Sequence, residues 1–127
     1  MAKGLLAFQI EDQLLGITER VRRAIGQCDV GVPAIRRLIA ACERLKLKPT
    51  SPIYKTDCWA HVGIGKLKTV IYTKEHLEYN KVVVEREAWK RHGWTLMAIA
   101  RRQINAMSDE QLTGQLRQTL VVLGKMK

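Results

Sequence analysis

The sequence predicts a mainly α-helical fold, a compact bundle of four or five helices in one domain spanning residues 1–127, with room for a small β-hairpin near residues 66–84. Two observations predict it. Apolar residues recur at helical spacing in several segments, and a Pro and a Ser-x-x-Gln capping box mark two helix starts. The chain is long enough to bury a core without disulfides or a metal.

The first predicted helix lies between residues 6 and 25. Its apolar side chains fall on one narrow arc of a helical wheel, and the members of this arc are Leu6, Ile10, Leu14, Ile17, Val21, Ala24 and Ile25. Glu19 and Arg23 are four residues apart, in the order that favours an ion pair. Arg20, Arg22 and Arg23 lie off the apolar arc, so we expect them to face outwards.

The second predicted helix begins at Pro33, a residue suited to a first helical position, and ends before Pro49. Its buried stripe is predicted to contain Ile35, Leu38, Ile39, Cys42 and Leu45. Cys42 is therefore interpreted as a small core residue. Residues 49–65 contain two Pro and two Gly and are interpreted as a connection.

Two helices are predicted in the C-terminal part. Residues 95–107 place Leu96, Ile99, Ala100, Ile104 and Met107 on one arc. Ser108 and Gln111 then form a capping box. It opens a last helix whose apolar residues are Leu112, Leu116, Leu120 and Leu123.

The middle of the chain allows two interpretations. Residues 66–72 alternate and become β-branched, as a strand does, and Val82–Val84 could pair with them as a hairpin. Alternatively, Thr73 could cap a long helix that runs through His92 and tolerates three valines. Periodicity does not separate a short strand from a buried helix, so both interpretations stay open.

The formal net charge is +10, from 22 Lys and Arg against 12 Asp and Glu. Such an excess favours polyanionic partners. The three cysteines lack paired spacing, which indicates a reducing compartment. No apolar run approaches the length of about 18 residues that a membrane span needs. We therefore expect a cytoplasmic protein that does not bind membranes.

The sequence predicts neither an enzyme nor a metal or cofactor site. No pair of carboxylates stands on an apolar face, as acid/base catalysis would need. Cys58 and His61 are three residues apart, but a zinc site would require two further ligands at familiar spacing. Residues 63–66 contain two Gly and a Lys without the full phosphate-loop pattern, so Lys66 is at most a phosphate contact.

Basic helix faces are the best functional candidates, because guanidinium groups fork onto phosphates and Trp can stack on bases. The predicted nucleic-acid-binding residues are Arg20, Arg22, Arg23, Arg36, Arg37, Arg44, Lys48, Arg86, Lys90, Arg91, Arg101, Arg102, Trp89 and Trp94. They indicate an accessory protein that grips the phosphate backbone of DNA or RNA. Its further partners would be other subunits of a nucleoprotein complex or a second copy of the chain.

Two other functions are compatible with the same charge. One is a sequence-specific DNA-binding regulator that uses a helix-turn-helix-like pair near residues 95–116. Against it, Asp109 and Glu110 open the second helix of that pair and would repel phosphates. The other is a basic adaptor or inhibitor that docks an acidic protein. Co-purification with a protein, but never with nucleic acid after high-salt washing, would select the adaptor over the accessory role.

Overall fold

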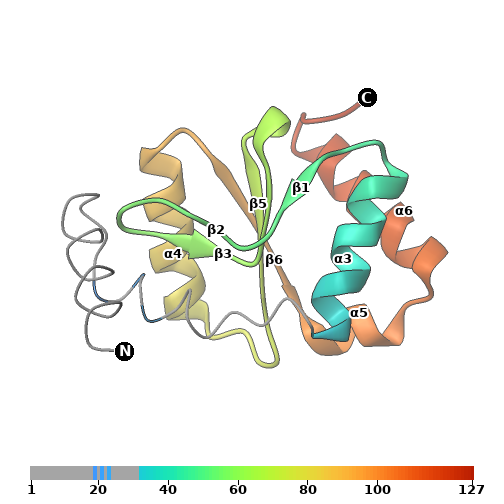
Figure 1. Ribbon diagram of the computed structural model, residues 1–127, viewed down its shortest axis with the longest axis horizontal. Helices are drawn as coiled ribbons and strands as arrows, with labels where there is room; N and C mark the ends of the chain where they lie inside the picture. The colour runs from blue at the N-terminus through green and yellow to red at the C-terminus, as the bar shows by residue number, and fades with distance from the viewer. Residues whose placement is uncertain (1–18, 20, 22, 24–31) are drawn as a thin grey trace, which may run out of the picture.

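A mixed four-stranded sheet lies at the centre of the computed structural model, which describes residues 19, 21, 23 and 32–127 (Figure 1). The strand order is β1-β4-β5-β6. The pairs β1–β4 and β4–β5 are antiparallel, and β5–β6 is parallel. The strands are β1 (Pro49–Thr50), β4 (Val62–Ile64), β5 (Thr69–Lys74) and β6 (Thr95–Ala100).

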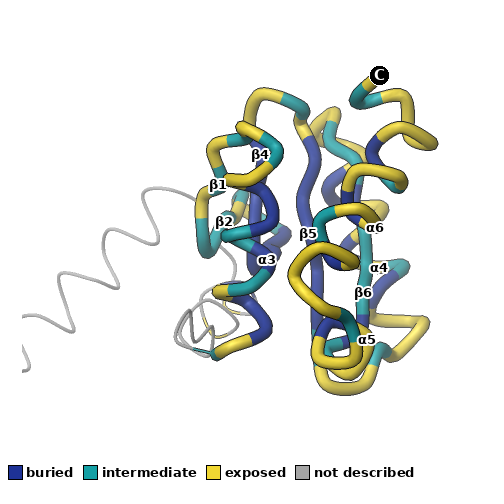
Figure 2. Tube along the Cα trace, turned by 90° about the vertical axis from the view of Figure 1, so that its right-hand side faces the viewer, coloured by how far each residue is buried: buried dark blue, intermediate teal, exposed yellow. Residues whose placement is uncertain are grey.

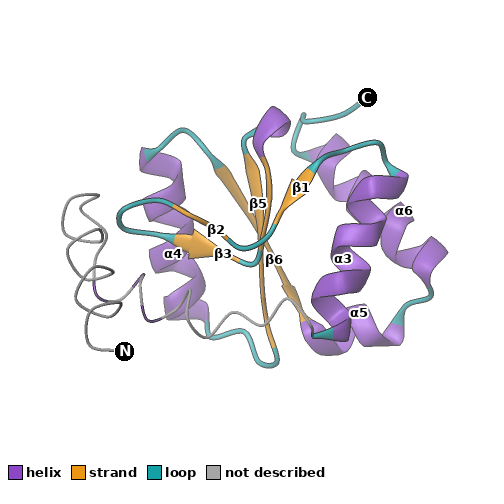
Figure 3. Cartoon of the chain, in the orientation of Figure 1, coloured by secondary structure: helices purple, strands orange, loops and turns teal. Residues whose placement is uncertain are grey.

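Helices cover both faces of this sheet (Figure 3). One face packs against α3 (Pro33–Arg44), α5 (Arg101–Ala106) and α6 (Asp109–Val122). The other packs against α4 (Tyr79–Arg91) and a separate hairpin of β2 (Ile53–Tyr54) and β3 (Trp59–Ala60). A short 3-10 turn, η1 (Gly65–Leu67), joins β4 to β5. The two inner strands, β4 and β5, are almost wholly buried, and Figure 2 shows β5 in the colour of buried residues.

Two predicted helices are confirmed, together with their start signals. Helix α3 begins at Pro33 and buries Ile35, Leu38 and Cys42. Helix α6 is capped by Ser108, whose hydroxyl accepts from the Gln111 N–H at 3.1 Å, while the Gln111 side chain accepts from the Ser108 N–H at 2.8 Å. In both cases the signal is local, so neighbouring residues alone determine it.

The predicted mainly α-helical bundle is wrong, because the described residues form a mixed α/β fold. The predicted helix 95–107 divides at Arg101 into strand β6 and helix α5. Leu96, Ile99 and Ala100 suit a helical arc, but they equally suit a strand with apolar residues on both faces. Strand β6 packs Met97 and Ile99 against one core cluster and Leu96 and Ala98 against the other, so its apolar residues form a continuous run without alternation.

The hairpin near residues 66–84 is also wrong. Val82–Val84 lie inside α4, so the helical alternative is correct for the valines. It is wrong for the helix start, because Thr73 lies inside β5 and α4 begins at Tyr79 after its N-cap Glu78. Strand β5 does exist, but its partners are β4 and β6. Residues 49–65, predicted as a connection, contribute four short strands. Each has two or three residues, too short for any periodicity to be visible.

The helix predicted over residues 6–25 lies almost wholly outside the described residues. Glu19, Val21 and Arg23 are described as helical, and Val21 is fully buried, as its place on the apolar arc predicts. The Glu19–Arg23 ion pair is present at 3.7 Å. Across the described part of the chain, none of the helices has the length and apolar character needed to cross a bilayer.

Candidate nucleic-acid interface

Four exposed lysines gather where two chain reversals meet at one end of the sheet, and we call Lys46, Lys48, Lys66 and Lys68 the lysine end. Strand β1 pairs with β4 so that Pro49 faces Ile64. The residue before β1 and the residues after β4 must therefore lie next to each other. Figure 1 shows the α3–β1 connection and the turn between β4 and β5 at the same end of the molecule, together with the C-terminus.

The lysine end carries charge that the rest of the described chain does not neutralise. None of its four ammonium groups makes an ion pair or hydrogen bond with another described residue. Glu43, in the last turn of α3, is exposed and precedes Lys46 by three residues. Four cations therefore face solvent without an ion-pair partner among the described residues, an arrangement that concentrates positive potential.

Two of these lysines adopt a backbone conformation that favours glycine. Lys46 has φ 63° and Lys68 has φ 46°, both in the left-handed region. Lys46 directly follows the C-cap of α3, and the Leu47 N–H donates to the Cys42 carbonyl at 3.0 Å, which closes the helix end. Glycine is the usual residue at such a position, and a side chain there costs about 1 kcal/mol.

Two predicted phosphate-binding arginines instead hold helices together. Arg37 donates to the Ile104 carbonyl at 2.6 Å, to the Met107 carbonyl and to Asp109 at 2.9 Å. Arg44 donates to the Thr113 hydroxyl at 2.7 Å and to the Asp109 carbonyl at 3.1 Å. Arg37 therefore joins α3 to α5 and to the start of α6, and Arg44 joins the end of α3 to α6 from an exposed position.

The two predicted stacking residues pack against each other. Trp89 is fully buried, and its indole N–H donates to the Trp59 carbonyl at 3.2 Å. Trp94 is half-buried, with its ring centroid 5.3 Å from that of Trp89, and the ammonium group of Lys55 lies 5.4 Å from its ring centroid. Trp89 therefore has no free face for a base, and Trp94 contributes mainly to the core.

The other predicted residues are distributed over separate elements. Arg86, Lys90 and Arg91 are exposed on α4, and Arg91 pairs with Asp57 at 3.3 Å. Arg101 and Arg102 begin α5, at the end of β6 opposite to the lysine end.

The remaining predicted residues lie near the N-terminal side of the chain. Arg36 is exposed in the first turn of α3, and Arg23 pairs with Glu19. Arg20 and Arg22 lie outside the described residues. Of the predicted set, only Lys48 belongs to the lysine end.

A second polar cluster surrounds His61, near the carboxyl ends of the parallel strands. The His61 ring is buried, and its Nδ1 accepts from the Thr73 N–H at 3.4 Å. Burial, and then the positive charges of Arg101 and Lys74, lower the pKa of His61 to about 4, so this ring is neutral at pH 7. Two buried atoms near this edge, Thr73 Oγ1 and Arg101 Nε, have no hydrogen-bond partner among the described residues.

The sequence contained only part of the signal for the lysine end. Lys66 stands in the Gly-Ile-Gly-Lys segment, where the sequence predicts at most a phosphate contact, and Lys48 belongs to the predicted basic helix faces. Their convergence depends on the β1–β4 pairing, which joins short strands without visible periodicity.

Comparison with known proteins adds nothing to this assignment: no family model, curated protein or solved structure matches the chain.

Proposed function

We propose that this chain is a nucleic-acid-binding accessory protein that grips the phosphate backbone through the lysine end. The observation that carries the proposal is the gathering of four exposed ammonium groups that lack carboxylate partners among the described residues. The net charge of +10 supports the proposal further, because it attracts polyanions over longer distances.

The chemistry of the lysine end favours recognition of the backbone over recognition of bases. Lysine ammonium groups act as point charges toward phosphate, whereas base recognition uses forked or planar side chains. The described tryptophans lie in the α4-side core, so stacking on bases is not expected from them. The proposed binding is therefore independent of nucleotide sequence and strongly dependent on salt.

The helix-turn-helix alternative has lost its structural basis, because residues 95–100 form a strand in place of the first helix of the pair. We therefore do not propose a major-groove reader at residues 95–116. An acidic protein is the other class of polyanion that would bind these lysines, and a polyglutamate competitor distinguishes it from nucleic acid.

The test is a salt titration of binding to a fluorescent duplex oligonucleotide, followed by anisotropy. Each lysine that contacts phosphate contributes about 0.9 to the slope of log affinity against log salt concentration. The double variant Lys66→Gln/Lys68→Gln should therefore make the slope shallower by about 1.8. The matched control is Arg86→Gln/Lys90→Gln on α4, which removes the same charge from exposed sites elsewhere.

The location of the effect decides between the interpretations. A loss of slope confined to the Lys66/Lys68 variant supports the proposal. Equal losses in both double variants would mean that the charge acts diffusely, and a wild-type slope near zero would remove the proposal. A polyglutamate competitor that displaces the duplex at equal charge concentration would indicate an acidic protein as the partner.

A further inference from the structure

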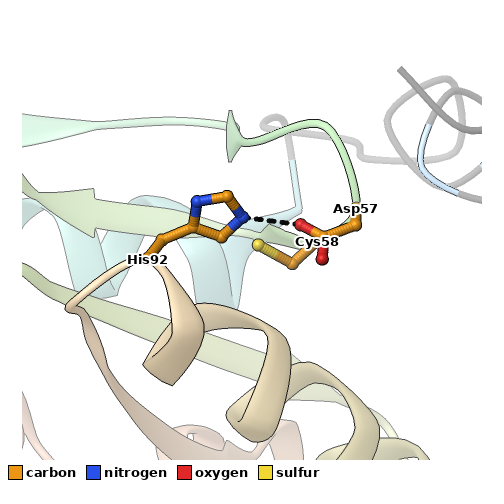
Figure 4. A group of neighbouring side chains, drawn as sticks. All are labelled: Asp57, Cys58 and His92. Atoms are coloured by element: carbon orange, nitrogen blue, oxygen red, sulfur yellow. Dashed lines mark hydrogen bonds and ion pairs between the residues drawn. The ribbon is translucent and has the colours of Figure 1, made fainter. Parts of the chain in front are cut away.

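Three side chains with different metal-ligating atoms converge outside the lysine end. They are Asp57, Cys58 and His92, and one ligand atom from each lies within 4.8 Å of the others. Figure 4 shows the Cys58 sulfur and the Asp57 carboxylate close to the imidazole ring of His92. The Asp57 Oδ1 and His92 Nε2 atoms are 2.7 Å apart. This cluster is the one group of three such residues found in the described part of the chain.

The two halves of the cluster come from segments that are fixed against each other. Asp57 and Cys58 lie in the turn between β2 and β3, which is closed by the Lys55 N–H donating to the Cys58 carbonyl at 2.8 Å. His92 is the C-cap of α4. Buried hydrogen bonds join the hairpin to α4: the Trp59 N–H donates to Glu85 at 3.2 Å, and the Trp89 indole donates to the Trp59 carbonyl at 3.2 Å.

We propose that Asp57, Cys58 and His92 form a binding site for zinc or a similar thiophilic divalent cation, with a fourth position open to water. Sulfur, imidazole nitrogen and carboxylate oxygen are the ligand types of zinc, and three protein ligands with an open position are a recurrent arrangement. Cys58 is buried, whereas the side chains of Asp57 and His92 are 35% and 32% exposed. The open position would therefore face solvent on the Asp57–His92 side.

The distances require only small side-chain movements. Tetrahedral zinc places its ligand atoms about 3.3–3.7 Å apart, given bond lengths of about 2.0–2.3 Å. The Asp57–His92 pair at 2.7 Å would open slightly, and the sulfur would approach both. Binding replaces the hydrogen of the Cys58 thiol: the S–H bond breaks, the sulfur–metal bond forms, and the proton passes to solvent.

Arg91 is the one described cation in direct contact with the cluster. Its Nη2 atom donates to Asp57 Oδ2 at 3.3 Å, and this is the carboxylate oxygen that does not contact His92. The Arg91 side chain is 65% exposed, so solvent screens its repulsion of a metal ion. Its hydrogen bond also orients the carboxylate, as outer-shell partners of metal ligands do.

Cobalt(II) titration of the full-length chain tests this site directly. The chain should be purified without a histidine tag and treated with a chelator. A cysteine ligand gives a thiolate-to-cobalt charge-transfer band in the near ultraviolet, which we expect to saturate at one cobalt per chain and to disappear when zinc is added. No nucleic acid is present, so this result is independent of the proposed function.

Variants identify the ligands. Cys58→Ser should abolish the charge-transfer band, and His92→Gln should weaken cobalt binding at least tenfold. Because His92 is partly exposed, His92→Gln also covers the case in which Cys58→Ser fails to fold. Matched controls are Cys42→Ala and Cys28→Ala for the other thiols, and His76→Gln for an exposed imidazole.

The outcomes that would overturn the proposal are equally specific. If no charge-transfer band forms at millimolar cobalt, the three side chains serve only as a hydrogen-bonded link between the hairpin and α4. If the band survives in His92→Gln with unchanged affinity, or disappears in Cys42→Ala or Cys28→Ala, the ligands have been assigned to the wrong place.

Discussion

The two faces of the sheet are packed by different chemistry. On the α3 side the buried cluster is mainly aliphatic, and its polar contacts, those of Arg37 and Arg44, lie at the rim. On the α4 side the buried cluster is aromatic and contains polar groups, among them Glu85. The stability of the aliphatic side depends on close packing, whereas the stability of the aromatic side also depends on its buried hydrogen bonds.

Removing a large side chain from either core should give the largest effects. Trp89→Ala should lower the free energy of unfolding by about 3–5 kcal/mol, and Leu120→Ala, in the aliphatic core, by about 2–5 kcal/mol. Urea unfolding measures both values. The near-ultraviolet circular dichroism of folded protein should change strongly for Trp89→Ala and little for Leu120→Ala. Similar spectral losses in both variants would mean that the two cores do not pack independently.

Acid should weaken the aromatic side selectively. The pKa of His61 is about 4 in the folded chain, below its ordinary value of 6.5, because burial, Arg101 and Lys74 all disfavour the charged ring. Between these two values the unfolded chain binds a proton that the folded chain does not. Stability should therefore be fully present above pH 6.5 and fall by up to about 3 kcal/mol as the pH falls to 4.

Urea unfolding at several pH values, with His61→Gln as the comparison, measures this loss. The Gln oxygen can still accept from the Thr73 N–H, but the side chain does not titrate, so the pH dependence between 6.5 and 4 should flatten. Asp57 should affect stability only at lower pH. Burial raises its pKa, but hydrogen bonds from His92 and Arg91 lower this pKa overall. An unchanged slope in His61→Gln would assign the acid sensitivity to other groups.

Adjacent arginines on α3 should differ sharply at the rim of the aliphatic side. Arg37→Ala removes the donors to the Ile104 and Met107 carbonyls and should cost about 1–3 kcal/mol. Arg36→Ala, at the exposed neighbouring position, should change stability by less than about 0.5 kcal/mol. Arg37→Lys should rescue little, because one ammonium group cannot reproduce the fork. Urea midpoints check all three, and equal effects at positions 36 and 37 would contradict the structural role.

The sequence was sufficient to predict a helix or strand where residues close together in the chain determine it. Pro33 and the Ser108–Gln111 box predicted two helices and their starts, and the place of Cys42 on an apolar stripe predicted its burial. It was insufficient where pairing determines the element: β6 satisfies a helical arc, yet its hydrogen bonds go to β5. Competition between local periodicity and long-range pairing cannot be resolved from one segment alone.

The same limit applies to the candidate sites. Charge predicted a polyanion partner, but proximity in sequence selected Arg37, Arg44 and Trp89, whose polar groups make hydrogen bonds to other parts of the chain. Residues 48 and 66 come together only through strand pairing. His92 reaches Asp57 across 35 residues because α4 packs against the hairpin. Glu85 had no signal beyond its position on the buried stripe of α4, between Val82 and Trp89.

The smallest expected effect separates stability from function at the lysine end. Lys68→Gly should leave stability unchanged or raise it by up to about 1 kcal/mol, because glycine adopts φ 46° without the side-chain penalty. Lys66→Gly, in η1 and without positive φ, should instead cost about 0.5–1 kcal/mol. Both variants lose one cation, so each should reduce the salt slope of duplex binding by about 0.9.

A lysine at position 68 that strengthens duplex binding without stabilising the fold would be explained by function, because the backbone conformation there favours glycine. If Lys68→Gly destabilised the chain as much as Lys66→Gly, or left the salt slope intact, this explanation of the left-handed lysine would be wrong.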